Sequence, residues 1–401
     1  MHVTRLPTLP HTRRAFVRNA MILGGTGAWR PHAPAQAAPP ATRFSAVEHL
    51  LENAVATGLV PGAVAAIGDQ GQVMWRGVFG HSALLPTPAP MLWSTRFDMA
   101  SLTKVLVTAP AIMQLQERGL LALDTPVWRY LPGFEAQGKQ DITLRLLLTH
   151  YSGLPPDLPL DTPWHGQTQA VRLVMDTRPT NPPGERFVYS DINYIALGLI
   201  VERLSGLSLA TYAERNIFTP LGLHHTTFLP KPEAPPAIAP TQYDENDHML
   251  QGVVHDPTAR RMGGVAGHAG LFSCAQDMIH YTQAMLDKRA GLPSPFPLRT
   301  RTLRLMSTPQ QPPGKTDLRG LGWDIATHYS TPRGDYFPEN SFGHTGFTGT
   351  SLWCVPDTRS FVLILSNRVH PRGGHSIVAL RHDVATAAAL ALHAHAAPMT
   401  P

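Results

Sequence analysis

Cysteine is nearly absent from this chain: only Cys274 and Cys354 occur among its 401 residues. Two cysteines cannot form the dense disulfide framework of a small secreted domain. We interpret both as small buried hydrophobes, and a disulfide between them stays an open alternative. The histidines lack a second cluster of ligands at zinc spacing, so no metal is expected. The glycine-rich run 263–270 matches no phosphate-binding motif, so no cofactor is expected either.

The chain also has little charge, with 15% charged residues, and its formal charge of +5 is misleading. Residues 1–37 hold five arginines and no acid, which leaves 33 − 5 = 28 basic residues against 28 acidic ones in the remainder. A near-neutral chain lacks the basic surface that phosphate groups require, so no nucleic-acid partner is expected. No run of about 18 apolar residues occurs, which excludes an obvious membrane span.

The first 37 residues have the organisation of an export signal. The pair Arg13 and Arg14 lies in a segment typical of the twin-arginine motif. A short apolar stretch follows at 20–29, and residues 35–37 (Ala-Gln-Ala) form a small-x-small cleavage site. The sequence therefore predicts twin-arginine export to a periplasm or to the cell exterior. An arginine-rich tail without a targeting role is the alternative, and an uncleaved signal would hold the protein at a membrane.

The hydrophobic pattern divides the rest of the chain into sheet-forming and helical parts. The expected elements are a helix over 43–58, a hairpin of strands 63–68 and 73–80, helices near 144–148, 192–204 and 277–286, strands 322–325, 349–355 and 361–367, and a final helix over 378–393. We therefore expect an α/β (α+β) fold, in which residues 38–100 and 300–401 form an antiparallel sheet flanked by the N- and C-terminal helices. Residues 101–299 would form a mostly helical domain, with the active-site cleft between the two.

A serine and a lysine lie one helical turn apart. Ser101 and Lys104 form the motif S-x-x-K at the start of an apolar helix, so both point from one face. Ser101 then lies near the helix N-terminus, where free N–H groups favour an oxyanion. A serine hydroxyl needs a base to become a nucleophile. Lys104 can be that base if burial lowers its pKa. The motif alone is common, but the chain has only five lysines.

Two later segments extend the pattern. Tyr189 precedes a predicted helix in the sequence Tyr-Ser-Asp, and His344, Thr345 and Gly346 stand at the start of a predicted strand. The order Ser/Lys, Tyr, His-Thr-Gly resembles that of the penicillin-recognising serine hydrolases. Within them it resembles the branch of class C β-lactamases, D-alanyl-D-alanine carboxypeptidases and β-lactamase-like esterases. Residues 146–154 are similar to a further segment of this branch.

Other segments point to one subgroup of the branch. Residues 252–272 and 365–371 look like stretches of its penicillin-binding-protein-like members. The resemblance covers about residues 43–393 and implies a β-lactamase/transpeptidase-like fold with an acyl-enzyme formed at Ser101. It also implies that Lys104 and Tyr189 share the proton transfers, in an order that stays open.

The resemblance assigns binding roles as well. The family's oxyanion hole uses two backbone N–H groups, here those of Ser101 and Phe347. The strand after His344, with Thr345 and Gly346, would line the cleft and hold an extended substrate by edge pairing.

Two residues depart from the β-lactamase pattern. Asp191 stands where those enzymes have Asn, and an ionised carboxylate accepts hydrogen bonds but donates none, which disfavours β-lactamase activity. His344 replaces Lys, and imidazole with a reference pKa of about 6.5 would attract a substrate carboxylate less strongly than Lys, and in a pH-dependent way.

Three other histidines receive less weight. We interpret His150 as bracing a helix, His268 as a local hydrogen-bonding residue with substrate contact as the alternative, and His255-Asp256 as part of a turn rather than of a triad.

The sequence as a whole therefore predicts an exported serine hydrolase without a metal or cofactor. Its substrate would be a small-molecule ester or a D-alanyl-type peptidoglycan peptide, with carboxypeptidase or esterase activity favoured over β-lactamase activity. The alternative is a catalytically weak penicillin-binding or cell-wall-binding protein. Nothing in the sequence specifies an oligomeric state.

Overall fold

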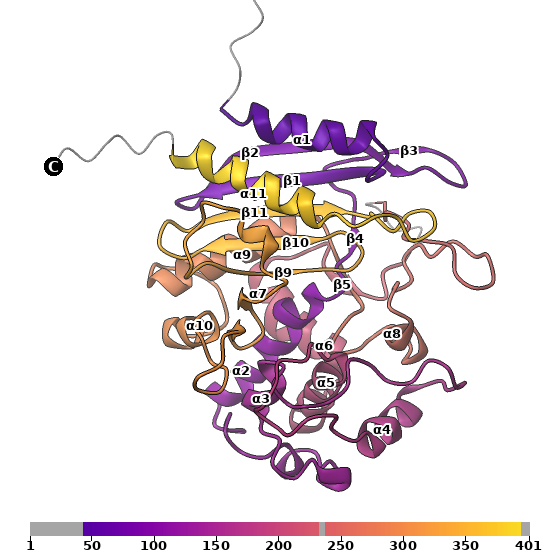
Figure 1. The fold of residues 1–401 in the computed structure, drawn as a ribbon, viewed down its shortest axis with the longest axis vertical. Coiled ribbons are helices and arrows are strands. Elements are labelled where there is room, and N and C mark those ends of the chain that lie inside the picture. The colour runs from indigo at the N-terminus through magenta and orange to yellow at the C-terminus, as the bar shows by residue number, and fades with distance from the viewer. Residues whose placement is uncertain (1–42, 232–236, 394–401) are drawn as a thin grey trace, which may run out of the picture. The chain divides into compact units, whose positions relative to one another are not determined.

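The computed structural model describes residues 43–231 and 237–393, and an eight-stranded antiparallel sheet lies at its centre (Figure 1). In spatial order its strands are β3 (Ala89–Pro90), β2 (Gln72–Ala83), β1 (Gly62–Asp69), β11 (Ser360–Ser366), β10 (Ser351–Val355), β9 (Phe342–Thr345), β8 (Asp324–Ala326) and β7 (Leu318–Arg319). The first and last parts of the described chain thus meet in one sheet, since β1 pairs with both β2 and β11. This arrangement confirms the predicted fold class.

The sheet is buried on both faces because its central strands are apolar throughout. Side chains alternate between the faces of a strand. Ile67, Val362 and Ile364 accordingly pack in one core with the helices α1 (Ser45–Ala56) and α11 (Val378–His393). Their neighbours Leu363 and Leu365 pack in a second, larger core on the opposite face. Figure 1 shows α1 and α11 together on one side of the sheet and α9 on the other.

The larger core is completed by the helical part of the chain. Its helices are η1 (Lys104–Thr108), α2 (Ala109–Glu117), η2 (Val127–Arg129), η3 (Ala136–Gly138), α3 (Leu144–Leu148), α4 (Gln167–Asp176), α5 (Asp191–Ser205), α6 (Leu209–Ala213), η4 (Glu214–Phe218), α7 (Thr219–Leu221), α8 (Pro257–Arg261), α9 (Ala275–Ala290) and α10 (Thr300–Met306), with η5 (Thr331–Arg333) beside the sheet. Helix α5 is buried all round over residues 192–201, which is typical of a central core helix.

The strand predictions were wrong in two places. The His-Thr-Gly segment ends β9 instead of starting a strand, because Gly346 N donates to Thr350 O over 2.7 Å and turns the chain into β10. A small second sheet was missed, with the strand order β4 (Phe97–Asp98), β6 (Leu271–Ser273) and β5 (Thr227–Phe228). These strands are two or three residues long, too short for a periodic signal.

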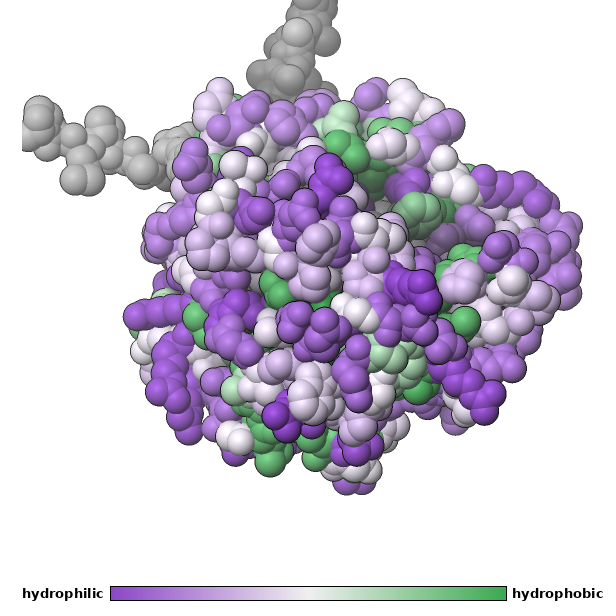
Figure 2. Space-filling model, turned by 60° about the horizontal axis from the view of Figure 1, so that its bottom comes forward, coloured by the Kyte–Doolittle hydropathy of each residue, from purple (hydrophilic) through white to green (hydrophobic). Residues whose placement is uncertain are grey.

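Three further features bear on the sequence predictions. Cys274 and Cys354 are both free and buried, which agrees with their interpretation as small buried hydrophobes. Among the described residues no single helix is long and apolar enough to cross a membrane, and only the bent pair 191–205 and 209–221 reaches that length and composition together. On the face shown in Figure 2, hydrophobic residues gather only in small separate patches on a mostly hydrophilic surface.

Candidate active site

Ser101 lies in a turn between β4 and η1 that is held by Asp98. The Asp98 carboxylate accepts hydrogen bonds from Ala100 N (2.8 Å) and His255 N (2.7 Å). Ala100, directly before the serine, has φ +47°, a left-handed conformation that is uncommon outside glycine and is found at functional sites. Burial raises the pKa of Asp98 to about 6, although its two backbone hydrogen bonds oppose this rise. Asp98 therefore fixes the turn that presents the serine hydroxyl.

The β9–β10 turn packs directly against this serine turn. Thr348 Oγ1 donates to Asp98 O (2.7 Å) and Thr350 Oγ1 donates to Met99 O (3.1 Å). A Cβ atom on Gly346 would lie 2.7 Å from Met99 O, which is too close for any side chain. Gly346 is thus required by the close approach of two backbones, and its segment forms one wall of the site beside Ser101.

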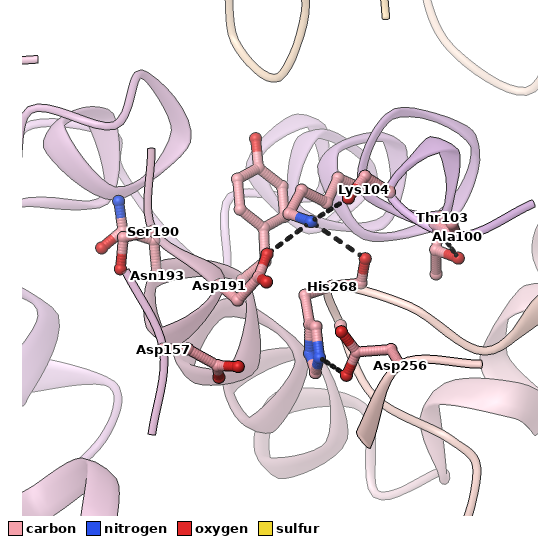
Figure 3. Close-up of polar contacts among 12 residues, drawn as sticks. Ala100, Thr103, Lys104, Asp157, Ser190, Asp191, Asn193, Asp256 and His268 are labelled. Carbon is pink, nitrogen blue, oxygen red and sulfur yellow. Dashed lines mark hydrogen bonds and ion pairs between the residues drawn. The ribbon is translucent and has the colours of Figure 1, made fainter. Parts of the chain in front are cut away.

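Lys104 is the centre of the polar network at Ser101. Its side chain is completely buried, and its Nζ contacts Ser101 Oγ (3.0 Å), His268 O (3.0 Å) and Asp191 Oδ1 (2.7 Å). Figure 3 shows Lys104 between Asp191 at the start of α5 and the backbone of His268. Two hydrogen bonds and an ion pair with a carboxylate surround the Nζ atom, an environment that suits a charged lysine.

The condition under which Lys104 alone could be the base, a pKa lowered by burial, is not met. Desolvation does act in that direction, but the Asp191 carboxylate and the Tyr189 hydroxyl outweigh it and raise the pKa of Lys104 above its ordinary value. Asp191, which stands where the β-lactamase pattern has Asn, is the largest contribution that opposes the desolvation of the charged lysine. The Lys104 ammonium cannot accept a proton from Ser101 until it has released one.

Tyr189 lies just before α5, as predicted, with Ser190 as the N-cap residue between them. Its ring lies 5.0 Å from Lys104 Nζ, and its hydroxyl is buried without a hydrogen bond of good geometry. Burial raises the pKa of Tyr189, while Lys104 and a contact with Ser101 act to lower it. The hydroxyl therefore stays protonated in the resting site and can donate a proton.

His344 reaches the site from the end of β9, and its ring lies 6.0 Å from that of Tyr189. Burial, with the positive charges of Arg319 and Lys104, holds the pKa of His344 well below its ordinary value. The expected protonation of His344 below about pH 6.5 is therefore wrong. Its Nδ1 lies 2.8 Å from Thr345 O, so a neutral ring with a proton on Nδ1 fits the site.

The residues of the two predicted oxyanion donors, Ser101 and Phe347, both line the cleft at the site. In the described part of the chain, the N–H groups of Ser101 and Phe347 make no hydrogen bond, so both are free to donate to a bound molecule. The Phe347 side chain is 61% exposed and lies between the ring of His255 (5.5 Å) and the guanidinium of Arg368 (4.6 Å).

A second buried ion pair lies behind Lys104, and no spacing in the sequence indicated it. His268 Nε2 lies 2.8 Å from Asp256 Oδ1, so Asp256 pairs with His268 and not with its neighbour His255. Burial disfavours both charges, yet their attraction raises the pKa of His268 and lowers that of Asp256. The pair anchors the residue whose carbonyl accepts from Lys104.

Potential metal ligands of Asp191, Asp256 and His268 lie within 4.8 Å of one another, a grouping that the sequence did not predict. Lys104 neutralises Asp191, and His268 neutralises Asp256. These charges therefore balance without a metal ion.

A cleft of about 410 Å³ opens in front of Ser101, with residues from both the helical part and the sheet part of the chain on its walls. It is lined by Ser101, Tyr189, Arg319, Asp324, His328, Tyr329, Thr331, His344, Thr345, Gly346, Phe347, Arg368, Ser376, Ile377, Val378 and Arg381. Three of these residues are arginines, whereas the one carboxylate, Asp324, contacts Arg319 over 3.4 Å. The cleft therefore carries an excess of positive charge.

The fold and this site define a serine hydrolase whose candidate nucleophile belongs to an S-x-x-K motif. Residues 47–386 match the Beta-lactamase family, and the chain belongs to that family. The predicted family and enzyme class are thereby confirmed.

Individual relatives agree with this placement. Over 364 residues the chain is 34% identical to the N-acetylmuramyl-L-alanine amidase of Bacillus subtilis (strain 168), a match that covers 81% of this chain and 80% of that protein. It is 32% identical over 340 residues to an Escherichia coli (strain K12) protein named provisionally as a D-alanyl-D-alanine carboxypeptidase, with 75% and 76% covered. A class C β-lactamase structure has a TM-score of 0.68 at 21% identity, covering 88% of this chain and 98% of that one, and shows likeness of fold.

Proposed function

We propose that this serine hydrolase forms an acyl-enzyme at Ser101 and hydrolyses an ester or a D-alanyl-type peptide. The observation that carries the proposal is the contact of Ser101 Oγ with the buried Lys104 Nζ at 3.0 Å, at the base of the cleft. Burial of a lysine beside a serine that lines a cleft costs folding free energy. A purely structural role does not require this arrangement.

Proton transfer in this site involves Asp191 as well as Lys104. As Ser101 Oγ attacks the substrate carbonyl carbon, its proton moves to Lys104 Nζ, and one Lys104 proton moves to Asp191, 2.7 Å away. Lys104 thus keeps its charge while Asp191 becomes neutral. Tyr189 gives its proton to the leaving group and regains one from the Lys104–Asp191 pair. A water molecule releases the acyl group by the same steps in reverse.

The carbonyl oxygen becomes an oxyanion during the attack. We assign its stabilisation to the Ser101 and Phe347 N–H groups, both of which lack a partner among the described residues. Loss of one such donor typically costs about 2.7–4 kcal/mol of transition-state stabilisation.

The positive cleft favours a substrate that carries a carboxylate. Arg319, Arg368 and Arg381 line it, and Arg381 also donates to Gly346 O and Thr350 O over 2.8 Å, behind the His-Thr-Gly segment. Peptidoglycan stem peptides carry such carboxylates, and the names of both relatives refer to peptidoglycan bonds. A carboxyl-bearing peptide of this class is the substrate that we propose, with small esters as simpler alternatives.

Export by the twin-arginine route is part of the same proposal. The signal at 1–37 lies outside the described residues, so the proposal depends on the motif alone. The double change Arg13→Lys with Arg14→Lys should leave precursor in the cytoplasm, and unchanged export of that variant would refute this route.

The proposed chemistry is tested by labelling with a fluorophosphonate probe and with a fluorescent penicillin. We expect covalent labelling of the wild-type protein by at least the fluorophosphonate and no labelling of Ser101→Ala with an unchanged circular-dichroism spectrum. Equal labelling of both proteins would refute the assignment of Ser101.

A further inference from the structure

His150 contacts the segment that carries Tyr189 in three ways. Val188 N donates to His150 O (3.0 Å), and Ser190 N donates to His150 Nδ1 (3.0 Å). The imidazole ring lies against the Tyr189 ring, with centroids 4.4 Å apart and planes inclined by 25°. One residue thus holds the backbone on both sides of Tyr189 and also supports its side chain.

The backbone of His150 is in an uncommon conformation. Its φ is +61°, in the left-handed region, directly after α3 and Thr149. A residue other than glycine rarely adopts this conformation, and it persists only where the surroundings enforce it. Here both the carbonyl and the imidazole of His150 face the 188–190 segment.

The imidazole is suited to act as a permanent acceptor. Because Nδ1 accepts from Ser190 N, the ring proton of the neutral form lies on Nε2. Burial, together with the charges of Arg319 and Lys104, holds the pKa of His150 well below its ordinary value. The acceptor at Nδ1 therefore persists throughout the neutral pH range.

We infer that His150 is a positioning residue for Tyr189, and that it sets where the tyrosine hydroxyl stands relative to Ser101 and Lys104. The inference rests on the proposed catalytic role of Tyr189. His150 is completely buried and is not among the residues that line the cleft. His150 therefore acts on the chemical step through Tyr189 and leaves substrate binding unaffected. A residue that only braces a helix would have no such effect on the chemical step.

Two substitutions separate the acceptor from the ring. His150→Asn keeps an acceptor atom at the position of Nδ1, tolerates a positive φ and removes the ring. His150→Phe keeps a ring and removes the acceptor. We expect kcat to fall by no more than about tenfold in the Asn variant and by about a hundredfold in the Phe variant, since a misplacement of about 1 Å can have that effect. KM should stay within about twofold of the wild-type value in both, because uniform substrate binding is untouched.

A second measurement reports on Tyr189 without turnover. For each protein, the tyrosinate absorbance of the same protein with Tyr189→Phe added is subtracted during a pH titration, which leaves the signal of Tyr189. Besides His150, the titratable groups that face Tyr189 are Lys104, Asp191, Tyr194, Tyr329 and His344, and none of them is substituted in the His150 variants. The pKa of Tyr189 is raised by burial, so a tyrosine released from this position in His150→Phe should titrate at a lower pH than in the wild type.

Tyr194→Phe is the matched control. Tyr194 also packs against His150, with centroids 5.1 Å apart, and its hydroxyl donates to Leu148 O (3.0 Å). Its loss should lower the unfolding midpoint while kcat and the Tyr189 titration stay as in the wild type. If His150→Phe does not fold, His150→Gln replaces it. The side-chain oxygen of Gln lies one carbon further from the backbone than that of Asn, which moves the acceptor away from the position of Nδ1.

Equal kcat values in the Asn and Phe (or Gln) variants, or an unchanged Tyr189 titration in the latter, would overturn the inference. Failure of the proposed function is distinguishable, since it would appear as full activity of Ser101→Ala and would leave the titration result standing.

Discussion

The carboxylate of Asp191 lies 2.7 Å from the ammonium of Lys104, and Lys104 in turn contacts Ser101. Asp191 stands where the β-lactamase pattern has Asn, and an amide carries no charge. In this protein the Asp191 carboxylate acts to raise the pKa of Lys104, and the proposed mechanism therefore treats Lys104 and Asp191 as one titrating unit.

Asp191→Asn should lower kcat for ester hydrolysis at pH 7 by about 10²-fold or more, because a positioned general base contributes about 10²–10⁴-fold. Without the carboxylate, desolvation lowers the pKa of Lys104. Partial activity should therefore return as the pH rises and Lys104 becomes a base by itself. The pH–rate profile of kcat measures both effects, and unchanged activity at pH 7 would contradict the proposed proton path.

The same variant should also be less stable. Removing one partner of a buried pair typically costs about 3–5 kcal/mol. The folded-state pKa of Lys104 is raised above 10.5, so its stabilising contribution is complete below that pH and is lost as the pH rises through the folded-state pKa. Urea unfolding at several pH values should show the largest deficit near neutrality and a smaller one above about pH 10. A deficit that grows with pH would refute the pair as its cause.

Asp98→Asn tests the turn that presents Ser101. Only one Asn side-chain atom is an acceptor, so either Ala100 N or His255 N loses its partner, and kcat should fall by about tenfold or more. The pKa of Asp98 is raised from 3.8 to about 6, so the folded state binds its proton more tightly than the unfolded state. Wild-type stability should then fall by about 3 kcal/mol as the pH rises from 3.8 through 6.

The urea-unfolding difference between wild type and Asp98→Asn should therefore change across this pH interval. A constant difference would show that Asp98 does not titrate as its burial implies.

Substrate preference tests the two departures from the β-lactamase pattern. A p-nitrophenyl ester or a D-Ala-D-Ala peptide should have a higher kcat/KM than nitrocefin, because Asp191 cannot donate to an acyl amide oxygen and His344 is neutral. The ratio of peptide to ester kcat/KM should not rise as the pH falls from about 8 through 6.5, where an ordinary imidazole would gain charge, because the pKa of His344 is held well below its ordinary value. A ratio that rises at acid pH, or nitrocefin as the best substrate, would contradict this account.

The sequence was most informative where a pattern is long and regular. The final helix was predicted with its observed bounds, 378–393, and the hairpin of strands 63–68 and 73–80 within a few residues. A long amphipathic or apolar run carries the period of its helix or strand in its own residues, so contacts with the rest of the fold change its secondary structure little. The contact between Ser101 and Lys104 could also be expected from the sequence, because both residues belong to one helical turn.

Contacts between distant segments could not be read from the sequence. The pairing of Asp256 with His268 depends on how the chain between α8 and β6 folds back, and no spacing rule describes it. The raised pKa of Lys104 and the lowered pKa of His344 arise from neighbours far away in sequence. His150 was interpreted as a helix brace because its positive φ and its contacts with residues 188–190 are visible only in the folded chain.

The intact mass of the protein after brief mixing with a p-nitrophenyl ester, a D-Ala-D-Ala peptide or a penicillin tests the central claim most directly. The account predicts an added mass equal to the acyl group for at least one of these compounds, located on the peptide that contains Ser101 and absent from Ser101→Ala. Hydrolysis with no adduct at any mixing time, or an adduct on another residue of a Ser101→Ala protein that stays active, would contradict it.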